Sequence, residues 1–162
     1  MNVYAFLSRN LAAHADQALF GTGTMTLTHA DVARESARHA ALFMHLGLAP
    51  GERVVAQMDG SPQALCLYFG ALRAGLVFVP IAASTSPANI AHILKETGPG
   101  LIVCHPDDRA AMQALARGAT VHTLADGAGT LPDALPEAGA FTTLARSEDD
   151  LAMLLYAGSD RG

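Results

Sequence analysis

The chain has 162 residues, of which 51% are hydrophobic and 15% are charged, and its formal net charge at pH 7 is −5. This composition predicts one globular domain of ordinary size and excludes a disordered segment. Lys95 is the single lysine. The chain therefore lacks the clustered basic surface that nucleic-acid binding needs, and we expect no nucleic-acid partner.

The N-terminus has neither a basic start nor a sustained apolar run, so a signal peptide is not expected. Residues 74–94 carry no charge, but Pro80 and Pro87 interrupt them, so they do not predict a membrane-spanning helix. Cys66 and Cys104 form no C-x-x-C pair, and we expect two buried, reduced thiols. These features predict a cytoplasmic protein without a membrane partner.

The first predicted element is a helix over residues 3–13, followed by a β-hairpin. The apolar stripe of this helix consists of Phe6, Leu7 and Leu11. Residues 18–20 and 25–27 flank the Gly- and Thr-rich residues 21–24, which is typical of two strands joined by a turn.

A long helix is predicted next. Thr28 is suited to its N-cap, and Asp31, three residues later, forms an approximate capping box. Gly47 stands in the usual position just past a helix end.

The following part has the clearest pattern. Residues 53–58 predict a buried strand, and Ser61 is a suitable N-cap for a helix over residues 63–74. This helix is apolar on most faces, so we expect it to be largely buried. Residues 76–79 predict another strand, which we expect Pro80 to stop.

The alternation then continues. It predicts a helix over residues 87–96, a strand over 101–104, a helix from 106 to Gly118 and a strand over 119–124. Such alternation is typical of βαβ units. We therefore expect an α/β fold: a Rossmann-like, doubly wound, mostly parallel sheet with helices on both faces.

Residues 125–147 are rich in Gly, Pro and Ala and predict a loose connection with one short helix near 131–135. An acidic turn then leads into a last predicted strand over residues 151–156.

This last strand runs into a loop of small residues, the kind of place where backbone N–H groups converge on phosphate in α/β proteins. The candidate phosphate-binding residues are Tyr156, Ala157, Gly158, Ser159 and Gly162. The alternative is a frayed chain end at the point where the sheet loses its next helix.

No other self-contained catalytic constellation is visible, and we assign no catalytic residue and no metal ligand. The seven histidines lack metal-ligand spacing. The acidic pairs Asp107-Asp108 and Asp149-Asp150 stand where a helix or a strand begins, so dipole complementation and solvation explain them. The turn over residues 59–61 could receive an anion, but ordinary helix capping explains it better.

Four segments, in this order, resemble the N-terminal portion of the AMP-forming acyl-CoA synthetases, the adenylate-forming family. They are residues 26–32 (TLTHADV), 47–54 (GLAPGERV), 67–75 (LYFGALRAG) and 150–156 (DLAMLLY). The resemblance covers essentially the whole chain. Within the family the chain is most similar to malonyl-CoA synthetases, through Val55-Ala56-Gln57, Val103-Cys104 and residues 118–121.

The resemblance implies an N-terminal subdomain of a two-step ligase. In this family a carboxylate reacts with ATP to give an acyl-adenylate and pyrophosphate, with magnesium, and CoA then displaces AMP. Residues 1–162 would be the N-terminal part of the synthetase domain, ending within the phosphate loop. Because most of the catalytic residues of the family lie beyond this part, we expect no activity and no bound cofactor for the chain alone.

The loop itself departs from the family pattern. Where the family has Tyr-Thr-Ser-Gly-Thr-Thr-Gly, Asp160 and Arg161 replace two hydroxyl residues, and the Asp160 carboxylate would repel a triphosphate. Upstream, residues 81–84 replace a stretch that usually contains Asn. Agreement up to Tyr156 followed by divergence suggests a frameshift or a premature stop.

Two alternatives come from other functional classes. One is a standalone nucleotide-binding module, which would need a ligand crevice at the carboxyl ends of the strands. The other is an interaction module completed by a separate chain that carries the rest of the synthetase. An incomplete subdomain also leaves apolar surface or a strand edge uncovered, so we expect self-association into a dimer or a higher oligomer.

Overall fold

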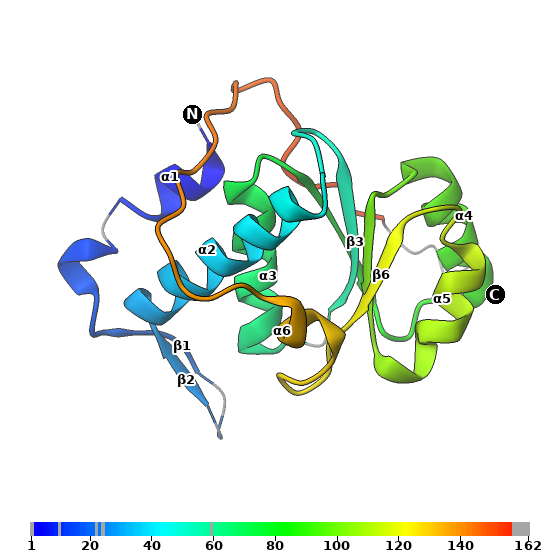
Figure 1. The fold of residues 1–162 in the computed structure, drawn as a ribbon, viewed down its shortest axis with the longest axis horizontal. Coiled ribbons are helices and arrows are strands. Elements are labelled where there is room, and N and C mark those ends of the chain that lie inside the picture. The colour runs from blue at the N-terminus through cyan, green and yellow to red at the C-terminus, as the bar shows by residue number, and fades with distance from the viewer. Residues whose placement is uncertain (1, 10, 22, 24, 59, 157–162) are drawn as a thin grey trace.

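The computed structural model describes residues 2–9, 11–21, 23, 25–58 and 60–156. It forms a three-layer α/β arrangement, with a small antiparallel hairpin beside it (Figure 1). In chain order the elements are α1 (Val3–Leu7), η1 (Ala12–His14), β1 (Ala18–Gly21), β2 (Thr26–Thr28), α2 (His29–His45), β3 (Arg53–Met58), α3 (Pro62–Arg73), β4 (Val77–Ala82), α4 (Pro87–Thr97), β5 (Leu101–Cys104), η2 (Pro106–Asp108), α5 (Arg109–Leu115), β6 (Thr120–Thr123) and α6 (Thr130–Ala134).

The central sheet has four parallel strands in the order β4-β3-β5-β6. The chain passes from β3 through α3 to β4, crosses back over β3 through α4 to β5, and continues through α5 to β6. The reversal of strand order between β3 and β5 makes the sheet doubly wound. The predicted fold class is therefore confirmed.

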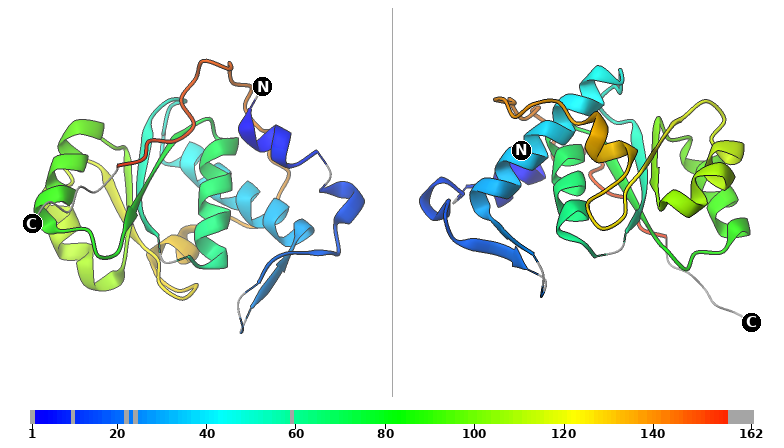
Figure 2. Two further views of the ribbon diagram at one scale, coloured as in Figure 1. Left: turned by 180° about the vertical axis from the view of Figure 1, so that it is seen from behind. Right: turned by 60° about the horizontal axis from the view of Figure 1, so that its bottom comes forward.

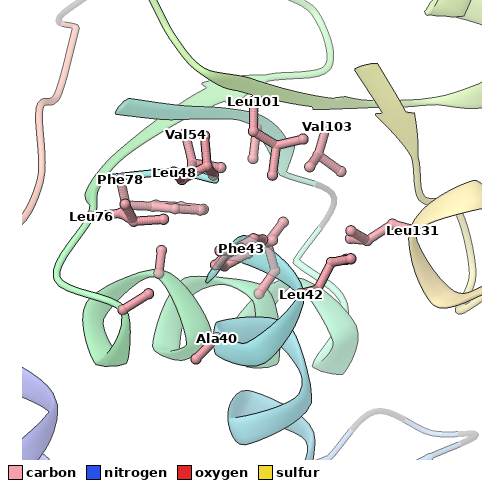
Figure 3. Close-up of a cluster of buried hydrophobic side chains, with 14 of the residues drawn as sticks. Ala40, Leu42, Phe43, Leu48, Val54, Leu76, Phe78, Leu101, Val103 and Leu131 are labelled. Carbon is pink, nitrogen blue, oxygen red and sulfur yellow. The ribbon is translucent and has the colours of Figure 1, made fainter. Parts of the chain in front are cut away.

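Two hydrophobic cores lie on opposite faces of this sheet. Figure 2 shows that helices cover both of these faces. Because successive side chains of a strand point to opposite faces, Val54 packs toward α2 and α3 while Val55 packs toward α4 and α5. Leu101 and Ile102 in β5 divide in the same way. Figure 3 shows the first core, including Phe43, Leu76, Phe78, Leu101 and Val103.

The helix starts follow the capping residues that the sequence indicates. Thr28 accepts from the backbone N–H of Asp31, and the Asp31 carboxylate accepts from the N–H of Thr28, so the capping box is complete. Ser61 caps α3 and Ser86 caps α4, each followed by a proline in the first turn.

The predicted helix over residues 3–13 is wrong in length and in its buried face. It ends after one turn, where the Ser8 N–H donates to the carbonyls of Tyr4 and Phe6, and a short 3-10 turn follows at η1. Tyr4 is the buried aromatic of this turn, whereas Phe6 is 57% exposed and stacks under Arg9. The physical reason is that Tyr4 packs against Phe69 of α3, whereas Phe6 of the predicted stripe faces solvent.

Strand β4 does not stop at Pro80, which is a second correction. The strand continues to Ala82, with Pro80 in register with Ala56. The N–H and carbonyl of Phe78 bond to the residue 152–154 segment on the outer side of the sheet. Pro80, two residues later, turns its nitrogen to the same side, so β3 loses no hydrogen bond.

The predicted strand over residues 151–156 is reduced to a single parallel bridge between Phe78 and Met153. The next rung of a parallel ladder would need an N–H at Pro80 to donate to the carbonyl of Leu154. Proline has none, so the ladder ends after one rung. Pro80 therefore leaves the hydrogen bonds between β4 and β3 intact but limits the pairing of β4 with residues 152–154.

The helix expected from 106 to Gly118 is divided into the 3-10 turn η2 and the shorter helix α5, which ends at Leu115. The other predicted elements are present with small shifts in their bounds. The short helix expected near 131–135 is α6, one residue earlier. Within the part of the chain that the structure describes, no helix is both long and apolar enough to cross a membrane.

Candidate functional site

The candidate phosphate loop follows the segment that bridges to β4. The Phe78 N–H donates to the Ala152 carbonyl at 3.0 Å, and the Leu154 N–H donates to the Phe78 carbonyl at 2.9 Å. This segment runs parallel to β4, so it leads Tyr156 toward the carboxyl edge of the sheet. Tyr156 is the one predicted site residue among those described. Ala157, Gly158, Ser159 and Gly162 lie outside the described residues.

Tyr156 packs against the core that α4 covers. Partial burial and the neighbouring Glu96 carboxylate raise the pKa of its phenol, which therefore stays neutral at pH 7. Tyr156 corresponds to the tyrosine that opens the loop in the family pattern, so a neutral phenol is the group expected there. The described residues include no other group of the loop, and no chemical step through ATP is derived from them.

The switch point between β3 and β5 is occupied by a side chain that the sequence analysis did not single out. Gln57 accepts at 2.9 Å from the backbone N–H of His105, and its amide donates at 3.0 Å to Asp108. These bonds tie the carboxyl end of β3 to the turn after β5. Ligands of open α/β sheets bind at such a point, and here protein groups fill it. The signal for it was a polar residue near the carboxyl end of a strand whose centre, Val54-Val55-Ala56, is apolar.

The acidic pairs have structural partners. Asp108 receives the Gln57 amide instead of capping α5. Asp150 accepts from the Ser147 N–H at 2.7 Å and forms an ion pair with Arg146 at 3.3 Å, so it closes a turn and is not merely solvated. At α3, the Ser61 hydroxyl accepts from the Ala64 N–H at 3.1 Å, as ordinary capping predicts.

Both thiols are buried, as predicted, and they are reduced in the structure. Burial raises the pKa of Cys66 to about 12 and that of Cys104 to about 11, so neither is a ready nucleophile. Burial also lowers the pKa of His39 and of His122, which favours the neutral imidazoles. Among the described residues, no group of three or more potential ligands is placed to hold a metal ion.

Hydrogen bonds to the Asn2 side chain and to the backbone of α3 hold the long connection after α6 in place. The Asn2 amide donates to the carbonyls of Leu72 and Leu144, at 2.7 and 2.8 Å. The Leu144 N–H in turn donates to the Arg73 carbonyl at 2.9 Å. The sequence analysis expected a loose connection here, but these bonds fix its path toward the segment that carries Tyr156.

Comparison with known proteins identifies the family to which the sequence belongs. The sequence matches the AMP-binding enzyme family over residues 7–159. A feruloyl-CoA synthase from Amycolatopsis sp. is 28% identical over 140 residues, which are 86% of this chain and 27% of the relative. The long-chain fatty acid–CoA ligase FadD13 of Mycobacterium tuberculosis is 31% identical over 77 residues, which are 48% of this chain and 15% of the relative.

Among solved structures, ATP-bound MatB from Rhodopseudomonas palustris superposes with a TM-score of 0.90 and 34% sequence identity. The match covers 96% of this chain and 32% of MatB. The chain therefore spans about a third or less of the length of each of these proteins.

Proposed function

The chain belongs to the AMP-binding enzyme family, and we propose that it is the N-terminal portion of a malonate–CoA ligase that forms an acyl-adenylate. The observation that carries the proposal is the family match through residue 159, which includes the segment that runs beside β4 toward the candidate phosphate loop. ATP, magnesium and CoA would be the cofactor, metal and co-substrate of the whole enzyme. Malonate is supported by the sequence phrases in β3, in β5 and at the start of β6.

We also propose that the chain has no ligase activity by itself. The chain matches 32% of MatB, and the family resemblance places most of the catalytic residues beyond this part. In the sequence, Asp160 adds a carboxylate where a neutral donor would face the triphosphate. Malonate-dependent ATP–pyrophosphate exchange by the purified chain should equal the background without enzyme, with MatB as the positive control. Exchange above background would contradict the proposal.

A pair of chimeras tests the N-terminal role. In the first, residues 1–156 replace the matching part of MatB, and the MatB loop is kept. We expect malonate-dependent AMP formation, because the two folds superpose closely. A folded chimera without AMP formation would contradict the proposed role.

The second chimera also carries this chain's own residues 157–162. We expect its rate to fall by about 100-fold or more, the scale on which the loss of one hydrogen-bond donor to a developing anion acts. Asp160→Thr in this chimera should recover part of the loss. Equal rates for both chimeras would show that the altered loop is functional.

The identity of the carboxylic acid substrate is tested separately, with the DNA sequence and with the complete enzyme. The DNA after the Gly162 codon, translated in all frames, should continue with family motifs. The enzyme reconstructed from those motifs should prefer malonate over ferulate or a long-chain fatty acid. Preference for another acid would overturn the malonate assignment and leave the family role intact.

The standalone nucleotide-binding module is not favoured. It needs an open crevice at the switch point, and Gln57 bridges that point to His105 and Asp108. The module completed by a second chain predicts a different outcome. In that case the chain would co-purify with a protein that carries the rest of the synthetase.

A further inference from the structure

A cavity of about 310 Å³ lies at the carboxyl edge of the sheet, on the side of α2 and α3. Hairpin strand β2 bounds it on one side and the segment from β6 to α6 on the other, and both lie at the lower edge of Figure 1. It is separate from Tyr156 and from the Gln57 bridge. The proposed ligase function assigns this cavity no role.

The cavity has a buried floor and apolar walls. His39, Cys66 and Leu124 line it and are buried. Leu27 comes from β2, and Leu135 follows α6 on the opposite side. An apolar cavity of about 150 Å³ holds one benzene, so this volume suits a molecule of about two fused rings.

The charged residues at the cavity are already paired with one another. Arg34 bonds to Asp31 at 2.9 Å and to Glu35 at 3.1 Å. Arg38 bonds to Glu35 at 2.9 Å and donates to the Pro136 carbonyl at 2.7 Å. Two guanidinium groups are thus balanced by two carboxylates, so this side of the cavity has no net positive charge to attract a carboxylate or a phosphate.

The polar groups on the floor are neutral. The Nδ1 atom of His39 lies 2.8 Å from the Glu35 carbonyl, which makes Nδ1–H the donor and leaves Nε2 as an acceptor. Burial lowers the pKa of His39 and raises that of Cys66, so both are uncharged at pH 7. A ligand with one hydroxyl group could donate to such an imidazole.

We propose that this cavity binds a small, neutral, largely apolar molecule that carries one hydroxyl group. The apolar walls supply most of the binding free energy, and the hydroxyl fixes the orientation on the His39 side. The paired charges make the site selective against acids of the same shape.

The experiment uses 2-naphthol as the neutral probe and 2-naphthoate as its anionic counterpart. Backbone amide chemical shifts of the 162-residue chain are followed by NMR while each probe is added. We expect saturable shifts at Leu27, Cys66 and Leu124 with 2-naphthol, and at least about tenfold weaker binding of 2-naphthoate. Shifts confined to other residues, no saturation, or equal affinities would overturn the proposal.

A filled cavity provides the second test. Leu27→Trp puts a larger side chain into the cavity wall and should weaken 2-naphthol binding by about tenfold or more. Leu155→Trp is the matched control, because Leu155 is 75% exposed and does not line the cavity. If Leu27→Trp fails to fold, Leu135→Trp tests the opposite wall. Unchanged binding in a folded wall variant would overturn the proposal.

Discussion

Arg73 and Phe141 are joined by a 2.8 Å hydrogen bond from the guanidinium Nη2 to the carbonyl oxygen, although they lie 68 positions apart. The same guanidinium donates to the Ala33 carbonyl at 2.7 Å and to the Ser36 hydroxyl at 3.1 Å, and it lies 4.8 Å from the Tyr4 ring centroid. One buried cation therefore connects α1, α2, α3 and the connection after α6. Its hydrogen-bond acceptors are neutral oxygens.

Arg73→Leu should lower the free energy of unfolding by about 2–4 kcal/mol, because buried carbonyls that it serves would lose their donor. Urea unfolding measures this change, and amide exchange should become faster in residues 141–144. Arg34→Leu is the control, because Arg34 is half exposed and forms surface ion pairs worth less than about 1 kcal/mol. Equal effects of the two substitutions would contradict the role of Arg73.

The second prediction concerns the contact between α2 and α3 at Gly70. A Cβ added there would lie 2.4 Å from the Cβ of His39 and 3.2 Å from the Ser36 carbonyl oxygen. Gly70→Ala would gain about 1 kcal/mol in helix propensity, but the clash should outweigh it and lower the free energy of unfolding by about 1–3 kcal/mol.

Gly139→Ala is the control for this substitution, because a Cβ there meets nothing within 4 Å. Its free energy of unfolding should stay within about 0.5 kcal/mol of the parent chain. Thermal or urea unfolding separates the two variants. A Gly70→Ala chain as stable as the control would mean that α2 and α3 pack less closely than described.

Sequence patterns were sufficient where the determinants are local. The apolar runs of the strands and the caps at Thr28, Ser61 and Ser86 lie within a few residues of the elements that they define. Topology made Pro80 misleading, because a proline is tolerated only on an edge strand and the sequence does not say which strand is at the edge.

The candidate site was predictable only in part. Tyr156 follows the segment that bridges to β4, its role in a phosphate loop stays a prediction, and the rest of the loop lies outside the described residues. Gln57 and Arg73 were missed because their partners are 37 to 69 positions away, so that no local pattern reveals them.

The third prediction tests why the segment before Tyr156 pairs with β4 at one rung only. Pro80→Val would supply an N–H that can donate to the Leu154 carbonyl, extending the parallel ladder. Amide exchange of Tyr156 should slow, because its N–H would then lie opposite the carbonyl of residue 80.

Stability should change little in the same variant. One hydrogen bond contributes about 1 kcal/mol, and loss of the proline constraint in the unfolded chain offsets a similar amount. Gln113→Val, at an exposed position in α5, is the control for the introduction of a valine elsewhere in the chain. Unchanged exchange at Tyr156 would show that something other than Pro80 limits the pairing.

We propose, as a fourth prediction, that the purified chain self-associates through its outer sheet edge. Leu151 is 59% exposed and Leu155 is 75% exposed, on either side of the single bridge to Phe78. Light scattering at tens of micromolar should give a dimer or a higher oligomer. Leu151→Lys with Leu155→Lys should shift the chain toward the monomer, whereas Met44→Lys, at an exposed position on α2, should not. A parent chain that stays monomeric would disprove this proposal.

The last prediction follows from the buried imidazole of His39. Burial lowers its pKa in the folded chain below the ordinary value of 6.5, so between these two values the unfolded chain binds more protons. The free energy of unfolding should therefore fall as the pH drops below about 6.5, by at most about 1.4 kcal/mol per pH unit for one such group. His122 contributes in the same direction, because burial lowers its pKa as well.

Asp31 acts in a separate, more acidic range. Hydrogen bonds from Thr28, with Arg34 nearby, lower its pKa from 3.8, so its contribution is lost only below that pH. Urea midpoints between pH 7.5 and 5 therefore isolate the histidines. His39→Gln should flatten the dependence on pH, while His92→Gln, an exposed histidine on α4, should leave it unchanged. If the slope of the His39→Gln chain matches that of the parent, the neutral, buried imidazole assigned to His39 is wrong.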